Sequence, residues 1–370
     1  MPERTLVYVG TYTDPIKFGT GQIFEGKGEG IYLLELDLSS GELRPVETFM
    51  NIVNPSYLAI SKKGGFLYAV NELKEFQGKP SGSVSSFKIS DEDGKLTFIN
   101  LQPTNGTDPC HVELNKEGTK LFVSNFMSGS VAVFPIRADG SISEISQFIQ
   151  HTGSSVNPAR QSGPHAHSLV FSPDEKFAFV PDLGLDKLMI YKSNDGEPAL
   201  IEAGVPYFKT QPGAGPRHCA FSPSGQFCYL INELDCTILA LSYNAKNGSF
   251  TELQSVSSLP EGVGISGNSC ADIHITPDGA YLFGSNRGYN SLSIYRICKE
   301  SGLLEYVGSQ SCGGEIPRNF MIDPGGNYLL CANQNSDNIV VFRIDLATGW
   351  LTETSRFNIP SPVCVKLLVL

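Results

Sequence analysis

GPRHCAFSPSGQFCYLINE, residues 215–233, is the fullest copy of a pattern that recurs along this chain. A proline leads into an apolar run, a Ser-Pro-Ser-Gly turn follows, and a second apolar run ends at an asparagine. Six copies follow one another at intervals of about 50 residues, a period typical of repeat folds. Their turns are marked by Ser61, Asn115, Ser172, Ser222, Thr276 and Asp323.

Each copy continues into two further short runs, such as GSVAVFPI from Gly129 and SISEISQF from Ser141. Aromatic and β-branched residues fill the runs, whereas Gly, Asp, Asn, Ser and Pro separate them, which is the chemistry of strands and turns. Four short strands in each unit of this period indicate the blades of a β-propeller.

The two ends of the chain together supply a seventh copy. TLVYVGTYT from Thr5, GIYLLELD from Gly30 and ELRPVETF from Glu42 match the last three strands, and SPVCVKLL from Ser361 matches the missing first strand. Closing the ring in this way pairs edges that would otherwise be exposed. The sequence therefore predicts an all-β, seven-bladed β-propeller of four-stranded antiparallel blades, the last closed by the N- and C-terminal strands, with residues 1–370 forming a single domain.

Composition narrows the classes of partner and compartment. A net charge of -11 argues against non-specific binding to nucleic acid or to an anionic membrane surface. The N-terminal apolar run is too short for a signal peptide, and no segment is long enough to span a bilayer. Most of the nine cysteines fall in predicted strands and no CxxC pair occurs, so we expect buried thiols rather than disulfides or a zinc site. These features predict a cytoplasmic protein; they leave its oligomeric state open.

Two connections are longer than the usual few residues. Asp14 to Glu29 lies between the first strand and its partner and is either a lid over the central mouth or an exposed insertion. Phe148 to His167 brings His151, Arg160, His165 and His167 toward a strand that lines the central axis.

Equivalent positions in the repeats carry unlike, ionic residues near that axis. Five residues before each turn mark stand Ser56, Cys110, His167, Arg217, Ala271 and Arg318, and the next position holds Tyr57, His111, Ser168, His218, Asp272 and Asn319. The exits of the second strands hold Tyr12, Glu72, Phe126, Leu183, Glu233, Arg287 and Gln334. Three arginines around one mouth suit a carboxylate or phosphate. The alternative is that these groups pair with one another, for instance Arg217 with Glu233, and only fill the channel.

GPHAHSLVFSPD, GPRHCAFSPSGQFCYLINE, CADIHITPDGAYLFGSNR and IPRNFMIDPGG resemble the motifs of the seven-bladed propeller lactonases. That family includes the bacterial propeller-type 6-phosphogluconolactonases and the fungal carboxymuconate lactonizing enzymes. The resemblance implies a catalytic set at His167, Arg217, Glu233 and Arg287. His165 is a second candidate for the histidine.

The chemistry expected from this set is hydrolysis of a small anionic sugar-acid lactone similar to 6-phosphogluconolactone. A base, His167 or Glu233, would activate water, and Arg287 or Arg217 would stabilise the oxyanion. We assign substrate binding to His165, His218, Asp272, Arg318 and Glu72, with Arg318 at the anionic end. We expect no cofactor and no metal. No G-x-S-x-G serine occurs, which argues against an acyl-enzyme.

Two other classes of function stay open at this point. A calcium-dependent propeller lactonase would need an oxygen-rich set such as Glu72, Asn125, Asn232 and Asp272. A WD-type interaction scaffold would show a period of about 40 to 45 residues and Trp-Asp endings. The only tryptophan is Trp350 and the mouth is ionic, so the lactonase hypothesis is the better supported one.

Overall fold

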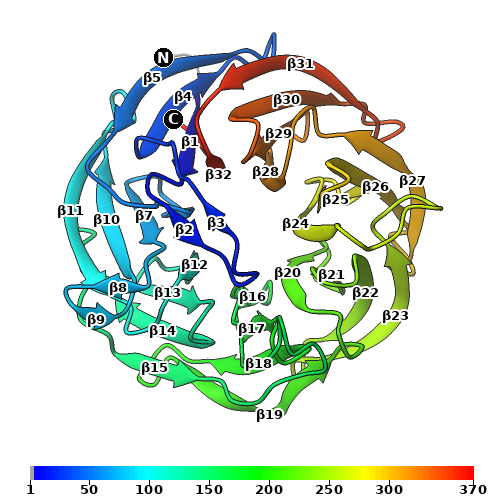
Figure 1. The fold of residues 1–370 in the computed structure, drawn as a ribbon, viewed down its shortest axis with the longest axis horizontal. Helices are drawn as coiled ribbons and strands as arrows, with labels where there is room; N and C mark the ends of the chain where they lie inside the picture. Colours follow the sequence, from blue (N-terminus) through cyan, green and yellow to red (C-terminus); the bar gives the residue numbers. More distant parts are fainter. Residues whose placement is uncertain (1–3) are drawn as a thin grey trace.

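The structure is a computed structural model and describes residues 4–370. Seven four-stranded antiparallel sheets are arranged as blades around a central axis (Figure 1). Within each blade the strands are given from the axis outward. The first three blades are β32 (Pro362–Val369), β1 (Thr5–Thr11), β4 (Ile31–Leu36) and β5 (Leu43–Phe49); β6 (Tyr57–Ile60), β7 (Phe66–Asn71), β10 (Ser83–Ile89) and β11 (Leu96–Pro103); and β12 (Pro109–Leu114), β13 (Lys120–Asn125), β14 (Ser130–Pro135) and β15 (Gln147–Gln150). The other four are β16 (Val170–Phe171), β17 (Phe177–Asp182), β18 (Lys187–Ser193) and β19 (Leu200–Lys209); β20 (Pro216–Phe221), β21 (Phe227–Asn232), β22 (Thr237–Asn244) and β23 (Ser249–Ser257); β24 (Ser269–Ile275), β25 (Tyr281–Arg287), β26 (Ser291–Ile297) and β27 (Leu304–Ser311); and β28 (Pro317–Ile322), β29 (Tyr328–Asn333), β30 (Asn338–Ile344) and β31 (Leu351–Asn358). The predicted fold class is confirmed.

Two small hairpins stand outside the blades. They are β2 (Ile16–Lys17) with β3 (Ile23–Phe24), and β8 (Glu75–Phe76) with β9 (Lys79–Pro80). The described part of the chain has no helix long and apolar enough to cross a membrane.

Both ends of the described chain meet in one blade. β32 pairs antiparallel with β1, from Thr5 opposite Val369 to Gly10 opposite Cys364, so the C-terminal strand is the innermost strand of the blade that begins the chain (Figure 1). The predicted closure by the two terminal strands is confirmed. It gives β1 a strand partner on both of its edges.

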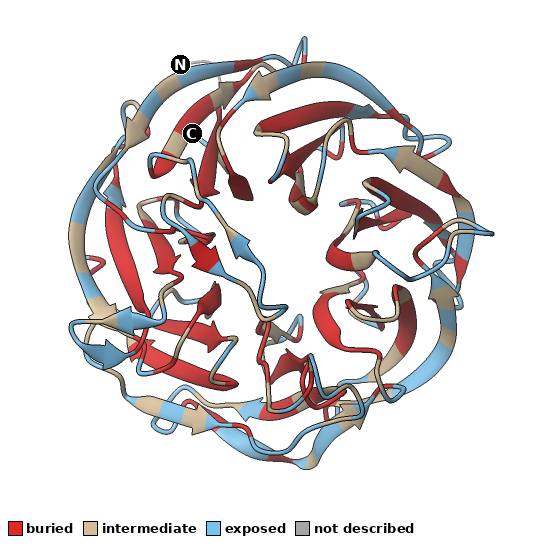
Figure 2. Ribbon diagram, viewed as in Figure 1, coloured by how far each residue is buried: buried red, intermediate tan, exposed pale blue. Residues whose placement is uncertain are grey.

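Burial falls from the inner strands to the outer ones (Figure 2). The second strand of most blades is buried at every residue, as in β13, β17, β21 and β29. These strands are covered on both faces by neighbouring blades, which explains their continuous apolar runs. Outer strands such as β31 are mostly exposed: after its buried first residue, β31 holds only exposed and intermediate residues.

Neighbouring blades are joined by an aromatic ring placed over a glycine. Phe66, Phe177 and Phe227 begin second strands, and each ring lies against a glycine in the outer turn of the next blade, namely Gly140, Gly248 and Gly302. A Cβ at Gly302 would lie 2.3 Å from the Phe227 ring, and the φ of this glycine is +72°. Only glycine tolerates both conditions, so the aromatic and glycine positions of the repeat are explained by one contact.

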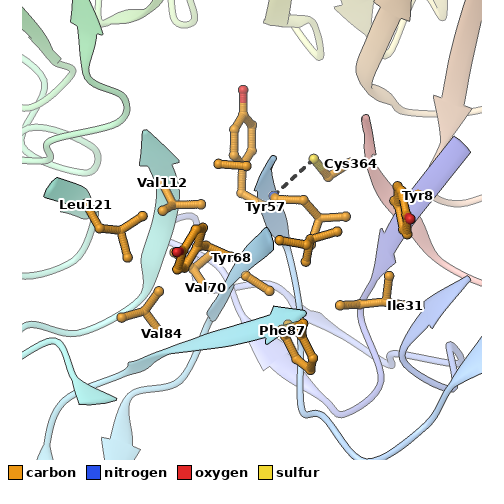
Figure 3. Packing of buried hydrophobic residues seen from close by; sticks show 14 of the residues in the cluster. Tyr8, Ile31, Tyr57, Tyr68, Val70, Val84, Phe87, Val112, Leu121 and Cys364 are labelled. Carbon is orange, nitrogen blue, oxygen red and sulfur yellow. Dashed lines mark hydrogen bonds between the residues drawn. The ribbon is translucent and has the colours of Figure 1, made fainter. Parts of the chain in front are cut away.

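The core between the first three blades shows how thiols serve as packing groups. Tyr8, Ile31, Tyr68 and Phe87 pack in one buried cluster, in which the Leu58 amide donates to Cys364 Sγ at 3.4 Å (Figure 3). Eight of the nine cysteines are buried, Cys298 is exposed, and none forms a disulfide.

Candidate active site

A cavity of about 400 Å³ lies at the axis, and the β2–β3 hairpin forms one of its walls. Figure 1 shows this hairpin crossing the central opening of the ring. The long connection from Asp14 to Glu29 therefore covers the mouth rather than forming a detached insertion. The ionisable side chains of the wall are Lys17, Glu72, Asp108, Cys110, Arg160, His167, Glu233, Arg287 and Arg318.

Glu233, at the exit of β21, gathers three arginines around one buried carboxylate. Arg160 Nη2 donates to Oε1 at 2.6 Å and Arg217 Nε donates to Oε2 at 3.1 Å, while Arg287 Nη2 forms an ion pair with Oε2 at 2.9 Å and donates its hydrogen bond to the Cys270 carbonyl. Burial alone would raise the pKa of Glu233, but the guanidiniums of Arg287, Arg160 and Arg217 outweigh burial and hold that pKa well below its usual value. Glu233 is therefore held as a carboxylate that pairs with three arginines.

The three arginines differ in what they offer to a ligand. Arg217 is 3% exposed, lies behind Glu233 and donates to the Ala271 carbonyl at 2.5 Å; burial, then Arg287, lowers its pKa to about 10. Arg287 lines the cavity, and its buried Nε has no partner among residues 4–370. The predicted Arg217–Glu233 pair is thus present, but it supports an open cavity instead of filling the channel.

His167, which precedes β16, stands beside this cluster and lines the cavity. Its Nε2 is 3.9 Å from Glu233 Oε2, and its Nδ1 is 3.8 Å from the Sγ of Cys110. Burial and then the positive charge of Arg217 hold the pKa of His167 well below its usual value. The imidazole is therefore neutral at neutral pH, which is the protonation state that a general base requires.

Arg318, on β28, differs from the other cavity arginines in its partners. Its guanidinium lies over the rings of Tyr12 and Phe18, at 5.3 and 5.2 Å, and its side-chain hydrogen bond is to Gln334 at 3.5 Å. Within residues 4–370 it forms no ion pair with a carboxylate. Its donors thus remain available to an anionic group of a ligand.

An acidic wall made by Glu72 and Asp108 completes the cavity. Tyr12 Oη donates to Glu72 Oε2 at 2.9 Å, and Lys74 Nζ lies 2.6 Å from Asp108 Oδ2. Burial and then the nearby Glu72 raise the pKa of Asp108 to about 6 despite that lysine. The hydroxyl groups of a polyol ligand could donate hydrogen bonds to these carboxylates. Its anionic group could accept hydrogen bonds from the guanidiniums of the cavity wall.

Sequence reasoning assigned no role to Arg160 or Asp108. Arg160 comes from the loop between β15 and β16, where no other repeat has a counterpart, and Asp108 precedes the proline that opens β12. The only available signal for Arg160 was its place in an unusually long loop that ends at His165 and His167.

The remaining predicted residues lie outside the cavity wall. His165 stacks on Phe126 with its ring centroid 4.6 Å away. His218 Nδ1 lies 2.7 Å from Asp272 Oδ1, deeper along the axis, and burial followed by the charge of Arg217 lowers the pKa of His218 to about 4. His165 and Asp272 are absent from the wall; His218 and Arg217 line a smaller chamber beneath it.

The oxygen-rich set considered for calcium is held by separate partners. Asn125 and Asn232 donate to Ser130 and Thr237 at the start of the next strand, and Asp272 accepts from Asn319. Within residues 4–370 no group of three His, Cys, Asp or Glu side chains is placed to hold a metal ion.

Comparison with known proteins identifies the family. A family model described as a seven-bladed β-propeller lactonase matches residues 6–367. The chain belongs to this lactonase family. A 6-phosphogluconolactonase of Bacillus subtilis is 37% identical over 362 residues, covering 98% of this chain and 97% of the relative. One from Formosa agariphila is 37% identical over 348 residues, covering 93% and 94%.

A solved propeller has nearly the same architecture. The periplasmic gluconolactonase of Pseudomonas aeruginosa has a TM-score of 0.89 and 34% sequence identity, with 99% of each chain covered. The predicted membership of the propeller lactonases is confirmed, and with it the general class of enzyme.

Proposed function

We propose that this lactonase hydrolyses a sugar-acid lactone that carries an anionic group, with 6-phosphogluconolactone as the best candidate. The observation that supports the proposal most is the difference in ion pairing among the arginines. Arg160, Arg217 and Arg287 are paired with Glu233, whereas Arg318 lines the cavity and has no carboxylate partner within residues 4–370. By their names, the Bacillus and Formosa relatives act on 6-phosphogluconolactone, and the Pseudomonas protein acts on gluconolactone.

In this proposal each step of ester hydrolysis has a residue on the cavity wall. Neutral His167 accepts a proton from water as the water attacks the lactone carbonyl. Arg287, whose Nε has no partner in the described part of the chain, stabilises the oxyanion of the tetrahedral intermediate. Collapse breaks the bond to the ring oxygen, which receives the proton from the His167 imidazolium and leaves a hydroxy acid. Glu233 holds Arg287 and Arg160 in place.

The decisive experiment is a pH-stat assay of the purified protein against a panel of lactones in the presence of EDTA. Neutral gluconolactone, 6-phosphogluconolactone and a carboxylated lactone should be compared, each with its uncatalysed rate subtracted. The proposal expects the highest kcat/KM for an anionic lactone, with no loss in the chelator. Absence of hydrolysis across the panel would overturn it, and activity restored by calcium would favour a metal-dependent enzyme.

Arg318→Ala should raise KM for an anionic lactone by about 10- to 100-fold, since hydrogen bonds to charged groups contribute about 1.5–3 kcal/mol each. KM for neutral gluconolactone should change little, because that substrate has no anionic end. Steady-state kinetics on the two substrates measure the difference. Equal losses on both substrates would show that Arg318 does not bind an anionic group.

The activity should persist in acid further than an ordinary histidine base allows. Because the pKa of His167 lies well below about 6.5, kcat/KM for a neutral lactone should stay constant as the pH falls through that value. The activity is lost only when His167 becomes protonated, at lower pH. An inflection near pH 6 would belong to Asp108 and should disappear in Asp108→Asn; an inflection that persists there would contradict the assignment of His167.

A cytoplasmic location also remains a proposal. Eight buried thiols without a disulfide suit a reducing compartment. Fractionation of the native host would test this, since the Pseudomonas relative is described as periplasmic.

A further inference from the structure

Beneath the cavity is a second, much smaller space along the axis. This chamber has a volume of about 10 Å³, and its walls include Ser56, Glu72, His167, Arg217, Arg318 and Val363. Glu72, Cys110, His167 and Arg318 belong to the walls of both spaces, so the chamber adjoins the deep end of the cavity. A space of about 10–15 Å³ on this scale is enough for one water molecule and too small for a larger ligand.

The hydroxyl of Ser56 is the feature that requires a partner in this chamber. Ser56 is 4% exposed, and its Oγ has no hydrogen-bond partner among residues 4–370. Leaving a buried hydroxyl unsatisfied costs about 1–3 kcal/mol. Ser56 occupies the repeat position that in other blades holds His167, Arg217 and Arg318, and these four side chains converge on the same chamber.

The other chamber walls offer both donors and acceptors. Arg217 and Arg318 supply N–H donors, whereas Glu72 and neutral His167 supply acceptors. A buried water generally needs two to four polar partners. The chamber is small, contains the Ser56 hydroxyl and is lined by polar donors and acceptors. It therefore has the properties of a water site, whereas apolar cavities stay dry.

We propose that this chamber binds the hydrolytic water and presents it to the lactone carbonyl from the deep end of the cavity. The inference rests on the proposed lactone hydrolysis. Ser56 and Glu72 hold the water, His167 takes one of its protons, and its oxygen forms the new bond to the carbonyl carbon. The bond from that carbon to the ring oxygen then breaks, and the same proton returns to the ring oxygen.

The placement explains how water and substrate can be bound together. The lactone enters beneath the β2–β3 hairpin and fills the 400 Å³ cavity, which excludes bulk water from the carbonyl. A water held in a separate chamber is not displaced by the substrate. Ser56 is thus a positioning residue for the nucleophile: it lines the chamber only, whereas Arg318 lines both spaces.

The test is Ser56→Val, which fills the chamber and removes the hydroxyl. We expect kcat to fall by about 100-fold, the effect of a misplaced nucleophile, with KM unchanged because the substrate cavity stays intact. Val363→Ile narrows the chamber from another blade and should lower kcat in the same manner. Ser124→Val is the matched control: Ser124 is a buried serine on β13 whose Oγ is also unpartnered, and it lines neither space.

Melting curves and a high-resolution crystal structure supply the other readouts. The wild type should show a water within hydrogen-bond distance of Ser56 Oγ, and Ser56→Val should lose it while melting as a folded protein. Wild-type kcat in both chamber variants, or a wild-type chamber without water, would overturn the inference. A bound water in a protein that hydrolyses none of the lactones would instead overturn the proposed function.

Discussion

His167→Ala is expected to lower kcat by about 10²- to 10⁴-fold on neutral and anionic lactones alike, the usual contribution of a general base. Every lactone must pass through attack by water, so the loss should not depend on the anionic group. KM should change little, because Arg318 and the acidic wall still bind the substrate. Initial rates at saturating substrate, with a melting curve for each variant, measure the effect.

Arg287→Ala is the companion variant. Loss of one oxyanion donor should lower kcat by about 10²- to 10³-fold, while Glu233 keeps Arg160 and Arg217 as partners. If His167→Ala retained near-wild-type kcat while Arg287→Ala did not, another group would have to be the base. Glu72, whose side chain accepts a hydrogen bond from Tyr12 at 2.9 Å, would then be the first to test.

Deleting residues 361–370 should unfold the ring or lower its melting temperature severely. The deletion removes β32, in which Val363, Cys364 and Val365 are each at most 2% exposed. Burial of three such side chains contributes roughly 5–9 kcal/mol, which is comparable to the whole stability of a typical domain, about 5–15 kcal/mol. The deletion also leaves the inner edge of β1 unpaired.

Deleting only Val369 and Leu370 is the control for that experiment, because both residues are exposed. Calorimetry should show near-normal melting for the short deletion and a collapsed or absent transition for the long one. A long deletion that melts like the full chain would contradict closure by the terminal strand.

The architecture could be predicted because the same pattern of strands and turns recurs in six copies along the sequence. The second strands read as apolar runs since neighbouring blades cover both faces, and the split seventh copy could be recognised from Thr5 and Ser361 by the same rule. The residues of the candidate site could be predicted from the opposite feature, the positions at which the copies differ. That comparison found His167, Glu233, Arg287 and Arg318 on the cavity wall.

What the repeat could not show was how side chains from different blades share partners. From the sequence, Glu233 is one more candidate base. In the structure its carboxylate pairs with three guanidiniums and holds them together. Arg160 lies in a loop without equivalents, so no comparison between copies could select it. His165 and Asp272 are near their expected positions along the chain, but their side chains pack against Phe126 and His218 instead of the cavity.

The closure of the ring has a consequence for the order of events during translation. β1 is synthesised before every other strand of the ring, and its inner partner β32 is synthesised after them. Phe18, in the β2–β3 hairpin that follows β1, and Arg318, on β28, line one cavity only in the closed ring. A nascent chain can therefore fold blade after blade and still have no complete substrate cavity, and catalytic competence arises in one late step when β32 docks.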